Sequence, residues 1–279
     1  MLKLLLSFAA ALSAAGLVLI IGFLLQAAWP LLQQQGLGVL WQADWYPYEN
    51  HFGLLAALVG SFWAVSVALV IAVPAGVAAA VLSVELLPVA GRRFMRFGME
   101  LLAGIPSVVY GLIGLWLLLP FLEAQFDLLT GHSLLAAGLL LAAMILPTIM
   151  VLAEDALAAV ALSQREAAMN LGLDWSSRLL RVLLPQAWPG IRTAVLLAMG
   201  RAMGETIAVL LVVGSIDRLP DPWYQLLQPA QTLTSRIGRE MAEAAVGSLH
   251  WAALMSSGLL LALIAAAIAA LSHLRMSRP

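Results

Sequence analysis

Residues 54–84 read LLAALVGSFWAVSVALVIAVPAGVAAAVLSV and contain no acidic or basic side chain. A helix that crosses the hydrocarbon core of a bilayer needs about 20 predominantly apolar residues, so this stretch is long enough to span a membrane. Five further segments meet the same criterion, at roughly residues 5–29, 97–120, 134–158, 190–214 and 249–272. The sequence therefore predicts an all-α, polytopic membrane protein with six transmembrane helices.

The overall composition supports this fold class. The chain is 63% hydrophobic and 10% charged, whereas a soluble globular domain is about 25% charged. Cysteine is absent, which excludes disulfides and thiolate metal sites, and the four histidines show no metal-ligand spacing. The first apolar run continues from Leu4 to Trp29, well beyond the signal-peptide core of about 7–15 residues. We therefore expect a retained transmembrane helix that ends at Trp29-Pro30, and no metal site.

Basic residues predict the orientation of the helices. If the six helices alternate across the bilayer, one side carries most of these residues, namely Lys3, Arg92, Arg93, Arg96, Arg165, Arg178, Arg181, Arg192, Arg275 and Arg278. The other side carries basic residues in one long loop, residues 215–248. By the positive-inside rule, both termini are cytoplasmic. We expect residues 1–53 to form the N-terminal transmembrane helix and an extracytoplasmic loop, and residues 54–279 to form the transmembrane core.

The loop SQREAAMNLGLDWSSRLLRVLLPQAWPG, residues 163–190, follows the fourth predicted span and predicts two short helices. The first covers about residues 163–171 and closes at Gly172, because glycine readily adopts the left-handed conformation that ends a helix. Asp174 is suited to cap the second helix. The pattern Glu166-Ala167-Ala168, Gly172, Val182 and Leu184-Pro185 resembles the EAA loop of binding-protein-dependent ABC importer permeases, with valine where that pattern usually has isoleucine.

This resemblance implies a type I, MetI-like permease architecture, whose coupling loop at about residues 163–189 docks into a cleft of a separate ATPase subunit. The residues expected to couple to the ATPase are Glu166, Ala167, Ala168, Gly172, Leu184 and Pro185. The chain has no Walker motif, so ATP and Mg are expected in the partner ATPase and no cofactor in this chain. The implied partners are an ATPase subunit dimer, a sister permease subunit, an extracytoplasmic binding protein and the lipid bilayer, with no nucleic acid.

Four segments narrow the resemblance to one substrate class. Residues 52–76, 100–120, 142–150 and 200–214 resemble the permeases of phosphate-specific ABC importers, and GETIAV (204–209) resembles the PstC-type subunit more than the PstA-type one. The resemblance implies a permease for inorganic phosphate, without catalytic residues of its own, in the bacterial inner (cytoplasmic) membrane. The alternatives are a permease for another oxyanion (sulfate, molybdate or phosphonate) and an ATPase-independent anion channel, which would not need a coupling loop.

The fifth predicted span contains LLAMGRAMGETIAVLLVVG, residues 196–214, with two charges, Arg201 and Glu205. Ionisable groups in a membrane are costly and tend to face an interior pathway. The two residues are four apart, so they lie on one helix face. They either form a structural salt bridge, or Arg201 contacts the transported anion while Glu205 holds or releases it, or both line a gate against another subunit. The resemblance supports the second hypothesis. Thr206 and Ser107 are further substrate-pathway candidates.

Three other acids lie near the cytoplasmic ends of predicted spans. We expect Glu100 to pair with Arg96, which precedes it by one helical turn, and Glu154 and Asp155 to be solvated at the membrane surface. The outer loop 215–248 either contacts a partner, lines an entrance or serves only as an interfacial connector.

Overall fold

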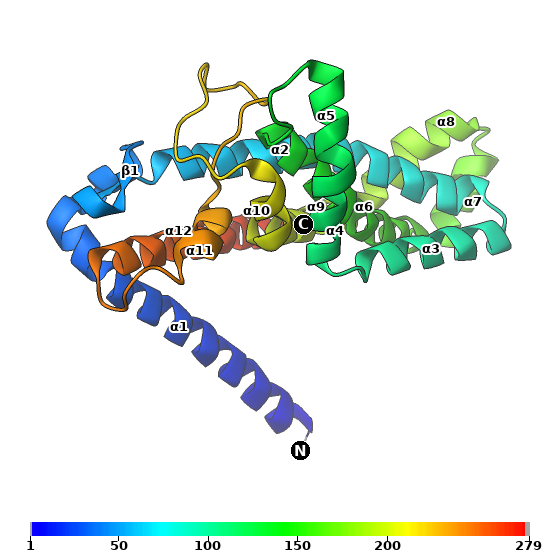
Figure 1. Ribbon diagram of the computed structural model, residues 1–279. Helices are drawn as coiled ribbons and strands as arrows, with labels where there is room; N and C mark the ends of the chain where they lie inside the picture. Colours follow the sequence, from blue (N-terminus) through cyan, green and yellow to red (C-terminus); the bar gives the residue numbers. More distant parts are fainter. Residues whose placement is uncertain (1, 277–279) are drawn as a thin grey trace.

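The computed structural model describes residues 2–276 and is almost entirely helical (Figure 1). Six helical segments are long and apolar enough to cross a membrane, which confirms the predicted number of spans. These segments are Leu5–Leu40, Leu55–Leu86, Ser107–Phe126, Leu134–Ala158, Trp175–Gly204 and Leu249–Ala270.

The α-helices are α1 (Leu2–Gln35), α2 (Leu55–Val81), α3 (Val89–Ala103), α4 (Ser107–Ile113), α5 (Leu119–Phe126), α6 (Leu134–Ala158), α7 (Leu162–Asn170), α8 (Trp175–Arg178), α9 (Leu184–Gly204), α10 (Ile207–Val213), α11 (Leu233–Glu240) and α12 (Leu249–Met276). Short 3₁₀ turns η1 (Gly36–Leu40) and η2 (Pro47–Glu49) flank β1 (Trp45–Tyr46), which pairs antiparallel with β2 (His51–Phe52). Three π-helical turns, η3 (Leu82–Leu86), η4 (Gly114–Leu118) and η5 (Leu179–Leu183), join consecutive helices.

Helix α6 is the centre of the bundle and packs most closely on α2. One face of α2 presents small side chains to the core, including Ala64, Ala68 and Ala72. A Cβ atom added at Gly138 of α6 would lie 2.5 Å from the Cβ of Val67, so the two backbones approach each other directly. Small residues of this kind are what allows close packing of helices in lipid, where the hydrophobic effect does not drive association.

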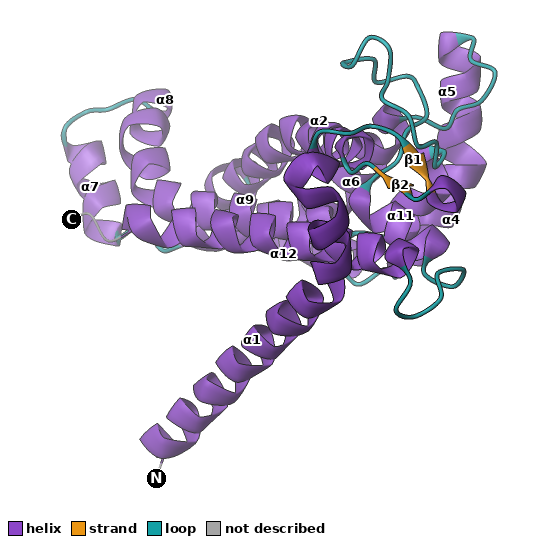
Figure 2. Cartoon of the chain, turned by 90° about the vertical axis from the view of Figure 1, so that its left-hand side faces the viewer, coloured by secondary structure: helices purple, strands orange, loops and turns teal. Residues whose placement is uncertain are grey.

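The two ends of the bundle carry different elements of the chain. In Figure 2 the N-terminal end of α1, the C-terminal end of α12, and helices α7 and α8 all lie toward the left, whereas β1, β2 and α11 lie toward the right. The N-terminal part of α1 stands apart from the other helices in Figures 1 and 2. This arrangement agrees with the predicted topology, in which both termini and the coupling loop share the cytoplasmic side.

Helix α1 is longer than predicted. It continues through Pro30 to Gln35 instead of ending at Trp29-Pro30. An interior proline removes a backbone donor and crowds the carbonyl four residues earlier. The flanking Ala28 and Leu31 are fully buried, so packing holds the chain helical across Pro30.

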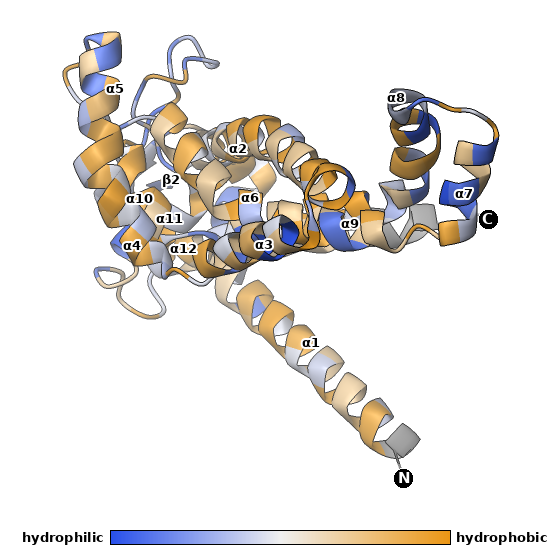
Figure 3. Ribbon diagram, turned by 90° about the vertical axis from the view of Figure 1, so that its right-hand side faces the viewer, coloured by the Kyte–Doolittle hydropathy of each residue, from blue (hydrophilic) through white to orange (hydrophobic). Residues whose placement is uncertain are grey.

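The third span lies at Ser107–Phe126 in place of the predicted residues 97–120. The chain bends at residues 104–106, between α3 and α4, because Gly104 is a poor helix former and the residue before Pro106 is disfavoured in helical geometry. Helix α3 exposes Phe94, Phe97 and Leu101 outward. Figure 3 shows hydrophilic residues on α3, α7 and α8, in contrast to the hydrophobic length of α1.

The inner end of α6 carries a buried carboxylate. Glu154 has no exposed side-chain surface and lies 2.5 Å from Arg92 Nε, so the prediction that it is solvated is wrong. Asp155 is half exposed and lies 2.6 Å from Arg96 Nη1. The predicted Arg96–Glu100 pair is confirmed at 3.0 Å. The difference arises because α3 folds against α6 and brings arginines from a distant part of the sequence onto Glu154.

Candidate functional site

The charged stretch 196–214 forms two helices, not one. Helix α9 ends at Gly204, Glu205 is extended (φ −72°, ψ 124°), and α10 begins at Ile207, so the prediction of one helix over 190–214 is wrong. The break is locally stabilised: the Thr234 hydroxyl donates to the Glu205 carbonyl at 2.8 Å, and the Ala208 amide donates to the Glu205 carboxylate at 3.4 Å. Glycine lowers helix stability by about 1 kcal/mol relative to alanine, so Gly204 favours the break.

The second helix break, at residues 104–106, lies beside the first. Gly111 of α4 packs on α10, since a Cβ atom added there would lie 3.0 Å from the Cα of Ala208. Arg201 Nη2 donates to the carbonyl of Ala103, the last residue of α3, at 3.4 Å. Discontinuous helices that meet inside a bundle are typical of the binding region of membrane transporters.

Arg201 contacts neutral acceptors. Its Nη1 donates to the Thr148 hydroxyl at 3.2 Å and its Nη2 to the Ala103 carbonyl. Within residues 2–276, the ion pairs of this structure do not include Arg201 with Glu205, so the structural salt bridge between them is not formed. The positive charge therefore lies inside the bundle without a carboxylate on it.

Glu205 faces a different space, a pocket of about 440 Å³. The pocket lies between α2, α6, α9, α10, α11 and α12 and is mostly apolar. Its polar lining comes from Ser61, Ser66, Glu205, Thr232 and Thr234. Arg201, Thr206 and Ser107 do not line this pocket. The structure thus separates Arg201 and Glu205, although they are one helical turn apart in sequence.

The remaining pathway candidates lie at the two breaks. Ser107 begins α4, and Thr206 donates weakly to the Gly204 carbonyl at 3.4 Å. Thr206 also contacts α11, where a Cβ atom added at Gly238 would meet its methyl group at 2.8 Å. Neither hydroxyl lies within hydrogen-bonding contact of Arg201 in the described chain.

The loop 163–189 folds as two short helices joined by a glycine turn. Helix α7 ends at Asn170, and Gly172 has φ +73°. Its amide donates to Met169 O (2.9 Å) and that of Leu173 to Ala168 O (3.3 Å), the paired hydrogen bonds of a Schellman motif. Asp174 caps α8 through the amides of Ser176 and Ser177. Hydrogen bonds from these serines lower the pKa of Asp174 to about 2.

The six residues expected to couple to an ATPase occupy different surroundings. Glu166 and Ala167 are exposed on α7, while Ala168 is buried. Leu184 and Pro185 lie inside a continuous helical segment, Trp175–Gly204, directly after the π-helical turn η5. Apolar side chains also project outward from this region: Leu162, Met169, Leu171 and Trp175.

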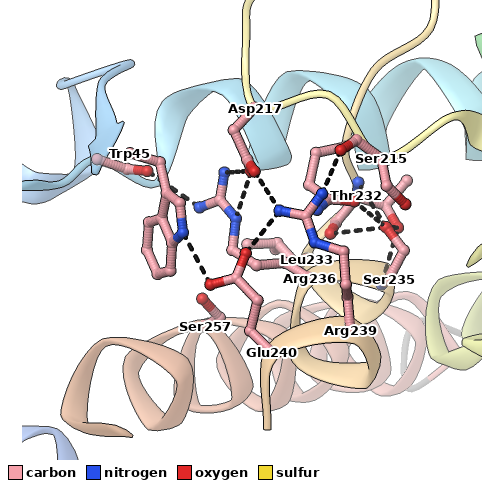
Figure 4. Close-up of polar contacts among 12 residues, drawn as sticks. Trp45, Ser215, Asp217, Thr232, Leu233, Ser235, Arg236, Arg239, Glu240 and Ser257 are labelled. Carbon is pink, nitrogen blue, oxygen red and sulfur yellow. Dashed lines mark hydrogen bonds and ion pairs between the residues drawn. The ribbon is translucent and has the colours of Figure 1, made fainter. Parts of the chain in front are cut away.

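The loop 215–248 is more than an interfacial connector, because most of α11 is buried and its side chains make polar contacts with other elements (Figure 4). Arg236 has no exposed side-chain surface; its Nη2 lies 2.8 Å from Asp217 Oδ1 and its guanidinium carbon 3.9 Å from the centre of the Trp45 ring. The Trp45 indole donates to Glu240 at 2.9 Å, and His250 Nε2 lies 2.8 Å from the same carboxylate. This network joins α11 to the β1–β2 hairpin and to α12.

Charge and burial oppose each other in this outer network. Burial lowers the pKa of Arg236, although the Asp217 carboxylate acts in the other direction. Burial would raise the pKa of Glu240, but hydrogen bonds from Arg239, His250 and Trp45 outweigh it and lower that pKa. Glu240 is therefore held ionised by Arg239, His250 and Trp45, and the buried Arg236 has Asp217 as its partner.

Comparison with known proteins identifies the family. Residues 72–278 match the family model for the inner membrane component of binding-protein-dependent transport systems. The chain belongs to this family. The permease is 40% identical over 220 residues to the probable ABC transporter permease protein YqgH of Bacillus subtilis, covering 78% of this chain and 70% of that one.

Two further relatives cover more of the permease. It is 34% identical to the phosphate transport system permease protein PstC of Mesorhizobium japonicum and 33% identical to that of Pasteurella multocida, covering 91% and 90% of this chain and 83% of each relative. Among solved structures, the inward-facing MetNI methionine ABC transporter matches with a TM-score of 0.57 at 20% identity, covering 79% of this chain and 91% of that one. The predicted MetI-like fold of the permease is therefore confirmed.

Glu85 was not singled out from the sequence, and the buried partner of Glu154 was not anticipated. Glu85 is only 6% exposed and pairs with Arg165, and Glu154 pairs with Arg92. One signal was present in the sequence, since Glu85 is the first acid after a long uncharged run. Its partner, 80 residues away, has no local signature.

Proposed function

We propose that this permease forms the translocation pathway of an ATP-driven importer of inorganic phosphate, together with a sister permease, an ATPase subunit dimer and an extracytoplasmic phosphate-binding protein. The observation that carries the substrate class is Arg201, a guanidinium inside the bundle whose contacts are neutral oxygens. The names of the PstC relatives support phosphate over sulfate, molybdate or phosphonate.

Arginine is chemically suited to this role. Its planar guanidinium stays charged and can donate two parallel hydrogen bonds to a phosphate. Thr148 and Ala103 orient the group without neutralising it, so an arriving anion does not have to displace a carboxylate. Ser107 and Thr206 lie at the two helix breaks. Their hydroxyls are proposed to hydrogen-bond to phosphate when the segments at these breaks change position during transport.

The pathway is proposed to bind phosphate weakly. Transport requires release, and a permanently strong anion site would trap the substrate. The pocket that Glu205 lines is mostly apolar, and its described lining residues include no arginine or lysine, so it offers an anion no positive charge. High affinity is therefore assigned to the separate binding protein.

The coupling loop is proposed to bind the ATPase through the exposed side chains of Glu166 and Ala167 on α7, whereas Ala168 is buried within this chain. Gly172 closes this short helix, and Leu184-Pro185 begins the helix that bears Arg201. A push on α7 can thus reach the proposed substrate region through one continuous segment, as rigid-body transmission requires.

The test is uptake of labelled phosphate by liposomes containing the complete transporter, with sulfate as the competing anion. We expect phosphate uptake to require ATP and the binding protein, and Arg201→Gln to abolish uptake while the complex still assembles. The matched control is Arg93→Gln, which removes an exposed arginine from α3. Normal phosphate uptake by Arg201→Gln would refute the substrate-contact role, and ATP-dependent uptake of sulfate alone would refute phosphate as the substrate.

A further inference from the structure

A buried acid at the inner end of α2 receives two arginines from the coupling loop. Glu85 lies in the π-helical turn η3, and its side chain is only 6% exposed. Arg165 Nη1, from α7, lies 2.5 Å from Glu85 Oε1, and Arg178 Nη2, from α8, lies 3.9 Å from Glu85 Oε2. One carboxylate thus holds both short helices of the loop.

Arg165 also reaches a second transmembrane helix. Its Nη2 donates to the carbonyl of Leu157 at 2.7 Å, in the last turn of α6. The last carbonyls of a helix have no intrahelical partner, so a cation is well placed there. Arg165 therefore fastens α7 to the ends of α2 and α6 together.

The same π-helical turn is joined to the bundle on its other side. Ser83 has no exposed surface, and its hydroxyl donates to Glu154 of α6 at 3.2 Å. Glu154 in turn pairs with Arg92 of α3. The turn η3 is thus the point where α2, α3, α6, α7 and α8 are tied by buried or half-buried polar contacts.

Helix α2 leads from this turn to the pocket that contains Glu205. Its residues Leu58, Ser61, Val65 and Leu69 line that pocket. A helix fastened at one end to α7 passes displacement of α7 along its length, since packed helices move as rigid bodies. In the absence of the Glu85 contact, α7 could move while α2 stays in place.

We propose that Glu85 is a positioning residue that fastens the coupling helix α7 to α2, so that movement of α7 is transmitted to the pocket bearing Glu205. This inference rests on the proposed ATP-driven transport. Glu85→Gln removes the charge that two arginines share and leaves them without a counter-ion in a largely buried place.

The first measurement is the ratio of imported phosphate to hydrolysed ATP in the complete transporter. We expect Glu85→Gln to lower this ratio by about tenfold, within the range by which single residues modulate coupling between sites. ATP hydrolysis itself is expected to continue. The matched control is Glu100→Gln, which removes an exposed acid at the same end of the bundle that pairs with Arg96 and not with α7.

The second measurement follows the helices directly. The chain has no cysteine, so spin labels can be placed uniquely at Val70→Cys on α2 and Met169→Cys on α7, both exposed positions. We expect a narrow distance distribution between the labels that nucleotide leaves unchanged, and a broadened or nucleotide-dependent distribution in Glu85→Gln. Distances and coupling that match those of Glu100→Gln would overturn the proposal.

A linked variant covers the case in which Glu85→Gln does not assemble. In Glu85→Cys/Arg165→Cys, a short bifunctional thiol reagent replaces the ion pair by a covalent bridge. The proposal is supported if phosphate import is restored only after the two cysteines are linked. It is overturned if import is the same before and after linking, or if the linked complex hydrolyses ATP but imports no phosphate. If the unmodified complex imports no phosphate, the proposed function fails, and the label distances still test the positioning role.

Discussion

The turn at Gly172 offers a sharp test of the coupling loop. Gly172 has φ +73°, and an added Cβ atom would meet no other atom within 4 Å, so substitution changes only the backbone preference. An L-residue in this left-handed conformation costs about 1–2 kcal/mol. At 25 °C, where about 1.4 kcal/mol corresponds to a factor of ten, Gly172→Ala should shift the equilibrium between the formed and the open turn by roughly 5–30-fold.

The assay is hydrogen exchange at the two amides that close the turn, those of Gly172 (alanine in the variant) and Leu173, which donate to Met169 and Ala168. In Gly172→Ala we expect these amides to exchange roughly 5–30-fold faster, because exchange reports the free energy of local opening. Gly172→Asn should lie closer to the unmodified protein, since asparagine tolerates the left-handed region better than alanine does.

Gly200→Ala is the matched control. Gly200 also has open space around its Cα, but it lies inside α9 with ordinary helical backbone, where alanine is favoured. If Gly172→Ala and Gly200→Ala leave the two amides exchanging at the same rate, the left-handed turn does not hold the loop and the reasoning is refuted.

Two further predictions concern stability. Gly138→Ala should destabilise the bundle by about 1–3 kcal/mol, because its Cβ would lie 2.5 Å from that of Val67. Thermal unfolding in detergent should show this loss as a lowered Tm. The control is Gly98→Ala, which has open space around it; an equal loss of Tm in this variant would contradict the packing argument. The outer network should confer stability that depends on pH. The pKa of Glu240 is lowered from its ordinary 4.5, so the ionised carboxylate adds to the free energy of unfolding above pH 4.5, and this addition is lost as the pH falls below 4.5. The Tm difference between the unmodified protein and Glu240→Gln should therefore shrink from pH 5 to pH 3, and a constant difference would show that this ionisation does not stabilise the fold.

The predictions that held were those that depend on local sequence. Residues 134–158 form one helix with the predicted bounds, since a long apolar run has no better local alternative in a membrane. Gly172 and Asp174 perform the turn and cap predicted for them, because both roles are backbone preferences of single residue types.

The predictions that failed were those in which a distant segment changes the local preference. The stretch 196–214 is apolar enough for one helix, yet a hydroxyl from α11 and the packing of α4 accommodate a break at Glu205. Glu154 was expected in solvent, but α3 returns and covers it with Arg92. A helical pattern in sequence describes a segment and its period, and it does not report which other segment supplies a partner for a polar group.

The sequence by itself determined that the chain is a six-span membrane protein with a loop of two short helices between its fourth and fifth spans, because apolar length, basic-residue placement and glycine and cap chemistry are properties of short segments. The tertiary structure decided that Arg201 and Glu205 face different surroundings, and that Glu85 holds the loop to α2. These contacts join residues up to 98 positions apart, and a buried charge is stable only where the fold brings its partners within hydrogen-bonding distance.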